Sequence, residues 1–109
     1  MPTPFDHLAS INRLVHEPSR LAILTALSAC EKADFVFLLT VTGLTKGNLS
    51  SHLSKLEHGG LIVIEKVFED RHPLTYAMLT PEGREGLEEH WKRLDAIRRG
   101  ARSWRPAKA

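Results

Sequence analysis

The sequence from Gly43 to Leu79 decides the fold: GLTKGNLSSHLSKLEHGG (43–60) is followed by LIVIEKVF (61–68), EDRHP (69–73) and LTYAML (74–79). In its first part, Leu49, Leu53 and Leu56 recur at i, i+4 and i+7, which is the spacing of one helix face. Thr45 can cap the first turn, and the glycine pair 59–60 supplies a left-handed stop. These signals predict a helix over residues 45–58.

The outer face of this predicted helix carries small and polar side chains. With the three leucines turned inward, a rotation of about 100° per residue places Gly47, Ser51, Ser54 and His58 outward, with Asn48, Ser50 and Lys55 on the flanks. Ammonium groups bind phosphates, an asparagine amide can pair with adenine, and serine hydroxyls adapt to either. A solvated face on a small protein has the same composition, so the helix alone leaves both interpretations open.

Two apolar-rich runs after the helix, residues 61–68 and 74–79, predict a β-hairpin. The charged segment 69–73 joins them. Because Pro73 restricts His72 and lacks a backbone N–H, we expect an open five-residue loop and not a tight two-residue turn. Arg71 and His72 would project from this loop. Arg71 then either meets the minor groove or phosphates of DNA, or pairs with a neighbouring acid in water.

Three segments before this region have helical signals. Residues 5–15 place Phe5, Leu8, Ile11 and Val15 at near-helical spacing, and Leu21, Ile23, Leu24 and Leu27 do the same after Pro18, which suits a first helical position. Asp34 can cap a third helix, in which Phe35, Leu38 and Leu39 face the core and which Gly43 ends. Val36 and Phe37 leave a strand as the alternative there.

A last helix should begin at Thr80-Pro81-Glu82 and run to about Gly100. Its apolar stripe has spacings of four and three residues and is longer than one compact core of this size can cover. We therefore predict a dimer interface shared with the helix over 5–15, against the alternative that the stripe packs on its own domain. The predicted interface residues are Leu8, Ile11, Val15, Leu87, Trp91, Leu94 and Ile97.

Five stretches in order, Pro18–Leu24, Gly43–Thr45, Asn48–Glu57, Gly60–Ile62 and Leu79–Arg84, resemble bacterial and archaeal winged-helix transcriptional regulators of the MarR-like and ArsR-like kind. The resemblance covers roughly residues 8–95. It agrees with the order of helix and hairpin in residues 43–79, which predicts a winged helix-turn-helix fold, mainly α with a small β-hairpin wing (α+β). The length of the chain predicts a single domain over residues 1–109. The resemblance also favours a helix over a strand after Asp34.

The resemblance implies a dimeric DNA-binding regulator. We expect a cytoplasmic, homodimeric, sequence-specific transcriptional regulator whose two-fold symmetry selects a palindromic site in double-stranded DNA. Helix 45–58 would lie in the major groove and segment 69–73 on the minor groove or the backbone. A winged-helix protein-interaction module without DNA binding is the alternative, and an unknown small-molecule effector between the dimerisation helices stays open. The predicted DNA-binding residues are Thr45, Lys46, Gly47, Asn48, Ser50, Ser51, Ser54, Lys55, Arg71 and His72.

The composition of the 109 residues, 42% hydrophobic and 26% charged, is that of one globular domain with no membrane-spanning run and no visible secretory signal. The net charge of +2 is weak evidence for nucleic-acid binding. Residues 46–79 hold four basic and four acidic side chains, whereas residues 91–109 hold seven basic residues against Asp95. The excess positive charge is therefore in the C-terminal segment.

Metal, redox and catalytic sites have little support in the sequence. Metal-sensing ArsR-like proteins carry paired cysteines on a helix, but Cys30 stands alone and is expected to be a small core residue in a reducing cytoplasm. The six histidines have no tight metal-ligand spacing. With no nucleophile–base set or phosphate-binding glycine loop, we expect no cofactor, no metal and no enzymatic activity.

Overall fold

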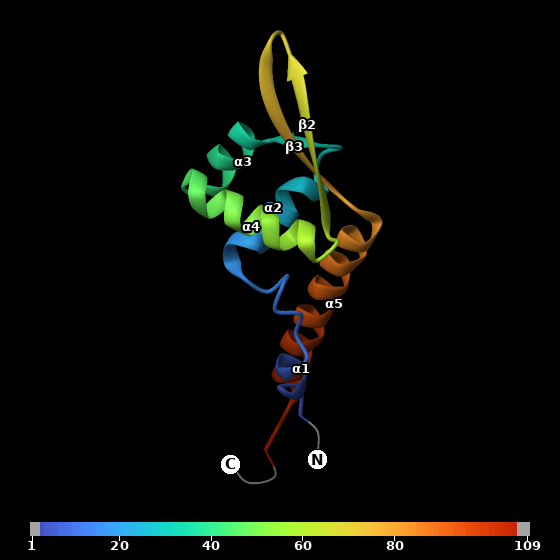
Figure 1. Cartoon of the computed structure of the whole chain (residues 1–109). Helices are drawn as coiled ribbons and strands as arrows, with labels where there is room; N and C mark the ends of the chain where they lie inside the picture. The colour runs from blue at the N-terminus through green and yellow to red at the C-terminus, as the bar shows by residue number, and fades with distance from the viewer. Residues whose placement is uncertain (1–2, 107–109) are drawn as a thin grey trace.

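The computed structural model describes residues 3–106, which form a small body with a hairpin projecting from one end and a long helix from the other (Figure 1). In chain order the elements are α1 (Asp6–Ala9), α2 (Pro18–Ser28), β1 (Ala33–Asp34), α3 (Phe35–Thr42), α4 (Lys46–His58), β2 (Ile62–Glu69), β3 (His72–Leu79) and α5 (Pro81–Ser103). The strands form an antiparallel sheet in the order β1-β3-β2. This is the predicted winged helix-turn-helix fold.

Side-chain caps set the starts of the helices. The Thr45 hydroxyl accepts a hydrogen bond from the Asn48 N–H at 3.1 Å, and the Asp34 carboxylate accepts one from the Phe37 N–H at 2.7 Å. Thr80 caps α5 in the same way. Gly43, with φ of 69°, adopts the left-handed conformation that ends α3. The helix predicted after Asp34 is thereby confirmed over its strand alternative.

The core lies where α2, α3 and α4 meet the inner face of the sheet. Its buried side chains come from all four elements and include the three leucines of α4, as predicted. Burying a leucine or isoleucine side chain stabilises the fold by roughly 1.5–3 kcal/mol. The largest of these buried residues are Val15, Ile23, Leu24, Leu27, Leu38, Leu49, Leu56 and Ile62.

Arg20 ties the segment before α2 to α4. Its Nε donates to the Leu14 carbonyl at 2.7 Å and its Nη2 to the Arg13 carbonyl at 3.2 Å. Its Nη1 lies 3.2 Å from His52 Nδ1, which must accept because a guanidinium can only donate. Burial by itself raises the pKa of Glu17 in this cluster, but bonds from the Arg20 and Ser19 N–H groups outweigh it and lower the pKa.

The predicted helix over residues 5–15 is wrong in extent. α1 has four residues, and the chain from Ser10 to Glu17 is irregular; Arg20 donates to the carbonyl groups of Arg13 and Leu14 within this segment. Val15, fully buried, and Leu87, 5% exposed, belong to the core of the protomer. Their prediction as dimer-interface residues is therefore corrected.

The wing tip also differs from the prediction. Glu69 pairs with His72, so Asp70 and Arg71 form a two-residue turn, with φ of 49° and 66°. These left-handed conformations suit the twist of a tight hairpin, and aspartate tolerates them well. Because the pairs of an antiparallel ladder alternate, Pro73 falls at a non-hydrogen-bonded position opposite Phe68, where a missing N–H costs no ladder bond.

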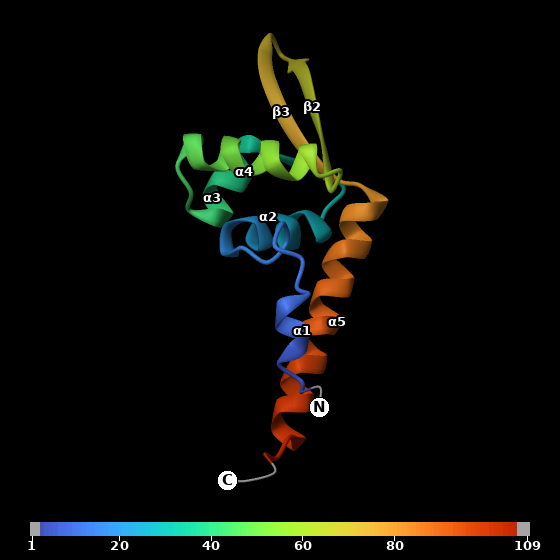
Figure 2. The ribbon, with the colours of Figure 1, turned by 60° about the horizontal axis from the view of Figure 1, so that its bottom comes forward.

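The molecule is elongated, with extents of 67 × 26 × 21 Å and a radius of gyration of 17.3 Å, against roughly 13 Å for a compact chain of this length. The second half of α5 extends beyond the body and has α1 beside it (Figure 2). The Phe5 and Trp104 rings pack edge to face at 5.4 Å, and Arg93 donates to the Ser10 carbonyl at 2.9 Å. Within residues 3–106 every helix is too short or too polar to cross a bilayer.

A histidine pair lies between the irregular N-terminal segment and α5. His90 is 3% exposed, and its Nε2 lies 3.2 Å from His16 Nδ1, so one ring donates to the other. Its Nδ1 is buried with no hydrogen-bond partner among the described residues. Burial, followed by the charges of His16 and Arg93, lowers the pKa of His90. The folded state therefore favours the neutral ring.

A Gly83→Ala substitution should destabilise the fold, because a Cβ at this position would overlap the backbone carbonyl of Leu61. We expect a loss of about 2–4 kcal/mol in the free energy of unfolding, measured by urea denaturation. Gly86→Ala is the matched control on the same helix, since its Cβ would meet a Leu61 methyl at 3.8 Å. That variant should gain about 0.5–1 kcal/mol from helix propensity, and equal effects of the two would contradict the packing.

Stability should fall as the pH drops from about 7 to 5. The unfolded chain protonates His90 near its ordinary pKa of about 6.5, whereas the folded chain resists protonation, so unfolding takes up a proton. The slope contributed is at most about 1.4 kcal/mol per pH unit. His90→Leu should flatten the pH dependence of urea denaturation, and His58→Leu, at an exposed position, should leave it unchanged. An unaltered slope in the His90 variant would refute this origin.

Candidate nucleic-acid interface

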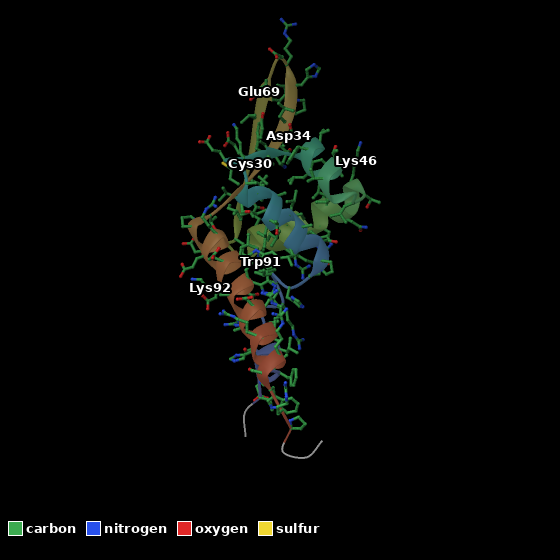
Figure 3. The ribbon with its side chains drawn as sticks, turned by 180° about the vertical axis from the view of Figure 1, so that it is seen from behind. Cys30, Asp34, Lys46, Glu69, Trp91 and Lys92 are labelled. Carbon is green, nitrogen blue, oxygen red and sulfur yellow. The ribbon has the colours of Figure 1, made fainter. Side chains whose placement is uncertain are left out.

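The outward face of α4 is exposed along its whole length. With Leu49 and Leu56 fully buried and Leu53 5% exposed, the helix is fixed about its own axis, and the opposite side faces solvent. Figure 3 shows Lys46 at the end of α4 that lies away from α5. The exposed residues on this helix include seven predicted DNA-binding positions: Lys46, Gly47, Asn48, Ser50, Ser51, Ser54 and Lys55.

Two residues of this region have structural tasks. The Thr45 hydroxyl is engaged as the cap of α4, which leaves its own proton available to donate. His52 is held between Arg20 and Glu17, with its Nδ1 3.7 Å from the Glu17 carboxylate, and so faces the body. At Gly47 an added Cβ would meet nothing within 4 Å, which means that the helix surface there is open.

The wing has two chemically different faces, because side chains alternate along a strand. Ile64, Lys66 and Thr75 line a groove against α4, which identifies the near face. Strand pairing places Phe68 and Pro73 on that same face, farther from the body. The far face carries Val63, Glu65, Val67 and Glu69 from β2, opposite Met78, Tyr76, Leu74 and His72 from β3.

A groove of about 410 Å³ separates α4 from the near face of the wing. Ser50, Ser54 and Glu57 of α4 form one wall, and Lys66 and Thr75 of the wing form the other. Its floor is apolar, made by Phe35, Leu53 and Ile64. Three hydroxyls, one ammonium group and the Glu57 carboxylate therefore line a channel that continues the exposed face of α4.

Arg71 occupies the wing tip and is exposed, as is His72. The tight turn holds the arginine at a fixed place beyond the ladder, whereas an open loop would have left its position variable. His72 pairs with Glu69, which puts it on the far face of the wing. The structure thus brings Arg71, and less directly His72, to the same end of the molecule as α4.

Sequence reasoning missed Lys66 and Thr75 as members of this surface. The signal that could have found them is strand alternation: both share a face with Ile64, which packs on the core. It also missed Arg20, whose role depends on backbone carbonyls brought near by the fold and leaves no periodic signal.

The charges of this region are sorted by face. Lys46 and Lys55 lie on the exposed part of α4, and Lys66 lies in the groove. Tyr76 on the far face donates to Glu69 at 3.4 Å and lies under the Lys32 ammonium group at 4.1 Å. Among residues 3–106, no three histidine, cysteine or acidic side chains come together as a metal site.

Comparison with solved structures agrees with this geometry. The transcriptional regulator homologue protein from Pyrococcus horikoshii OT3 is 35% identical, with a TM-score of 0.82, over 88% of this chain and 97% of that chain. AbsC, a MarR family transcriptional regulator from Streptomyces coelicolor, is 28% identical, with a TM-score of 0.59, over 77% and 59%. The transcriptional repressor CouR, bound to a 23-mer DNA duplex, is 25% identical, with a TM-score of 0.68, over 84% and 62%.

No curated protein was found to match the chain. A family model described as a winged helix DNA-binding domain matches residues 19–97, which span α2 to the second half of α5 and include the whole of α4 and the wing. The chain therefore belongs to the winged helix DNA-binding domain family and is a MarR-like winged-helix transcriptional regulator.

Proposed function

We propose that the chain acts as a homodimer that recognises a palindromic site in double-stranded DNA. Each protomer inserts α4 into a major groove and rests its wing on the adjacent minor groove or its phosphates. The observation that carries this proposal is the fully exposed, hydroxyl-rich and lysine-flanked face of α4 opposite its buried leucines. CouR, which is similar over most of this chain, is bound to a DNA duplex in its structure.

Within α4 the exposed side chains divide into two roles. Lys46 and Lys55 supply attraction to phosphates, which does not depend on sequence. Asn48 and Ser51, with Ser50 beside them, carry the donors and acceptors that base edges require. Gly47 adds no bulk, so the backbone of the first turn can approach the DNA closely.

The dimer surface that we propose is the exposed side of the stalk, made by α1 and α5. Trp91 is 42% exposed, and Phe5 and Leu8 are 44% and 50% exposed. Leu94, Ile97 and Ile11 lie half-buried in the same region. This part of α5 projects beyond the folded body and keeps large apolar side chains in water. A second copy that covers these side chains would stabilise the helix.

The charge pattern of α5 favours an antiparallel partner. Residues 81–90 hold Arg84 against four glutamates, whereas residues 91–103 hold five basic residues against Asp95. Two such helices related by a two-fold axis and running antiparallel place the acidic half of each against the basic half of the other. A parallel pair would place like charges together.

One hollow in the fold could hold a small-molecule effector. A mainly apolar hollow of about 510 Å³ lies where Leu21 of α2, Val41 of α3 and Trp91 of α5 meet. A small apolar effector of this regulator would act from this hollow, because a ligand there touches both the DNA-binding body and the proposed dimer surface.

Asn48→Ala and Lys55→Ala should separate base recognition from phosphate binding. On a duplex selected by the chain from random DNA, Asn48→Ala should lower affinity about tenfold to a hundredfold while random DNA is bound as before. Lys55→Ala should weaken binding to both the selected duplex and random DNA, and it should reduce the slope of log affinity against log salt by about one. Fluorescence anisotropy at several salt concentrations measures both effects.

Equal losses of Asn48→Ala on selected and random duplexes would contradict the assigned roles. If the unmodified chain shows no salt-sensitive binding to any duplex, the alternative of a protein-interaction module replaces the proposal.

Trp91→Glu should convert the dimer to a monomer, because it places a charge in the centre of the proposed apolar surface. Light scattering after gel filtration measures the mass, and Val36→Glu, at a 67% exposed position on α3, is the matched control. The Trp91 variant should also lose the affinity gained from two half-sites on one duplex. A dimer that survives this substitution would place the interface elsewhere.

A further inference from the structure

Phe68 is 76% exposed, the highest fraction among the large apolar side chains of residues 3–106. A single exposed apolar residue is common on protein surfaces and carries no meaning by itself. The position of Phe68 makes it informative. Glu69 and His72 form the last strand pair before the turn, and Phe68 lies in the next pair toward the body, close to Arg71 at the tip.

Strand alternation places the Phe68 ring on the near face of the wing. It lies two residues beyond Lys66 on β2, and its cross-strand partner Pro73 lies two residues from Thr75 on β3. Lys66 and Thr75 line the groove whose other wall is Ser50 and Ser54 of α4. The ring and Pro73 therefore form an apolar extension of a polar groove.

The polar groove followed by the apolar Phe68 and Pro73 matches the alternation of phosphate and deoxyribose along one DNA strand. When α4 lies in the major groove and the wing tip reaches the neighbouring minor groove, the backbone that separates the two grooves runs between them. Hydroxyl and ammonium donors suit its phosphates, while the carbon-bound hydrogens of deoxyribose are the apolar part of that backbone. Lys66 offsets the charge of Glu57, which also lines the groove.

We propose that Phe68 packs on the deoxyribose of the DNA strand that passes between α4 and the wing, with Pro73 supporting the ring. This inference rests on the proposed DNA binding and adds a contact that depends on neither base sequence nor salt. Unlike a lysine contact, an apolar contact releases no counterion, so it contributes affinity without changing the salt slope.

The test compares Phe68→Thr with Val63→Thr in the full chain. Both residues lie on β2, and Val63, 46% exposed, points to the far face, so the two variants lose an exposed apolar group from opposite sides of one strand. Threonine retains a high strand propensity, and unchanged melting temperatures check folding. Phe68→Leu, which keeps an apolar side chain, serves as the conservative variant.

On the duplex selected from random DNA, Phe68→Thr should bind about fivefold to tenfold more weakly, as expected for uncovering part of a phenyl ring. Val63→Thr should bind like the unmodified chain, Phe68→Leu should retain most of the affinity, and the salt slope should be the same for all. Hydroxyl-radical footprinting, which cleaves at deoxyribose, should show protected sugars between the major-groove and minor-groove contacts losing protection in Phe68→Thr alone.

Equal affinities of Phe68→Thr and Val63→Thr would overturn the inference while leaving the proposed function intact. A loss in Phe68→Thr that comes with a shallower salt slope would also overturn it, since the ring would then act by positioning a phosphate contact. An unmodified chain that binds no duplex would overturn the proposed function and this inference together.

Discussion

The burial of one leucine stripe determines what the rest of the molecule can present. Leu49, Leu53 and Leu56 leave almost no surface in water, and rotating α4 by a single residue would expose them and bury serines in their place. At roughly 1.5–3 kcal/mol for each buried leucine, such a rotation would cost a large part of the stability of a small domain. Arg20 reinforces the arrangement, because it joins His52 on the edge of α4 to two carbonyl groups of the preceding segment. The exposed face of α4 is thus fixed by contacts on its hidden side.

The two ends of the molecule have different physical requirements. At one end, α4 and the wing surround a groove lined by polar groups, and this surface is complete within one protomer. At the other end, α5 leaves the body after His90 and keeps Trp91 and Trp104 partly in water, beside α1 (Figure 2) and its flanking residues Phe5 and Ser10. The large apolar side chains of this half of α5 therefore keep a surface that a second copy could cover. The surface proposed for recognition and the surface proposed for assembly are therefore separated along the 67 Å length of the chain.

The sequence predicted those features that local chemistry determines. Asp34, Thr45 and Thr80 cap the helices that follow them, and the period of the leucines in α4 identified its buried face. The failures arose where distant parts of the chain decide the outcome. Residues 5–15 have a helical apolar spacing, but the helix ends at Ala9, Val15 enters the core, and Arg20 binds the carbonyl groups of Arg13 and Leu14. Pro73 led to the prediction of an open five-residue loop. In the structure Pro73 lies at a non-hydrogen-bonded position of the ladder, so a two-residue turn forms at Asp70 and Arg71. The groove residues Lys66 and Thr75 became visible once strand and helix were placed together.

The neutral charge of residues 46–79 is not an argument against DNA binding once its distribution is considered. Four acidic residues balance four basic ones in this region, but the fold moves Glu65 and Glu69 to the far face of the wing, while Glu57 lies in the groove and Asp70 shares the tip turn with Arg71. Glu65 and Glu69 share the far face of the wing with Tyr76, and Lys32 covers that ring. Lys46 and Lys55 lie on exposed α4, Lys66 lies in the groove, and Arg71 is at the tip. Because charges in water are screened over about 8–10 Å, a phosphate at the groove experiences the nearest side chains more than the net charge of the region. Glu57 is the acid that faces such a phosphate, and Lys66 across the same groove offsets it.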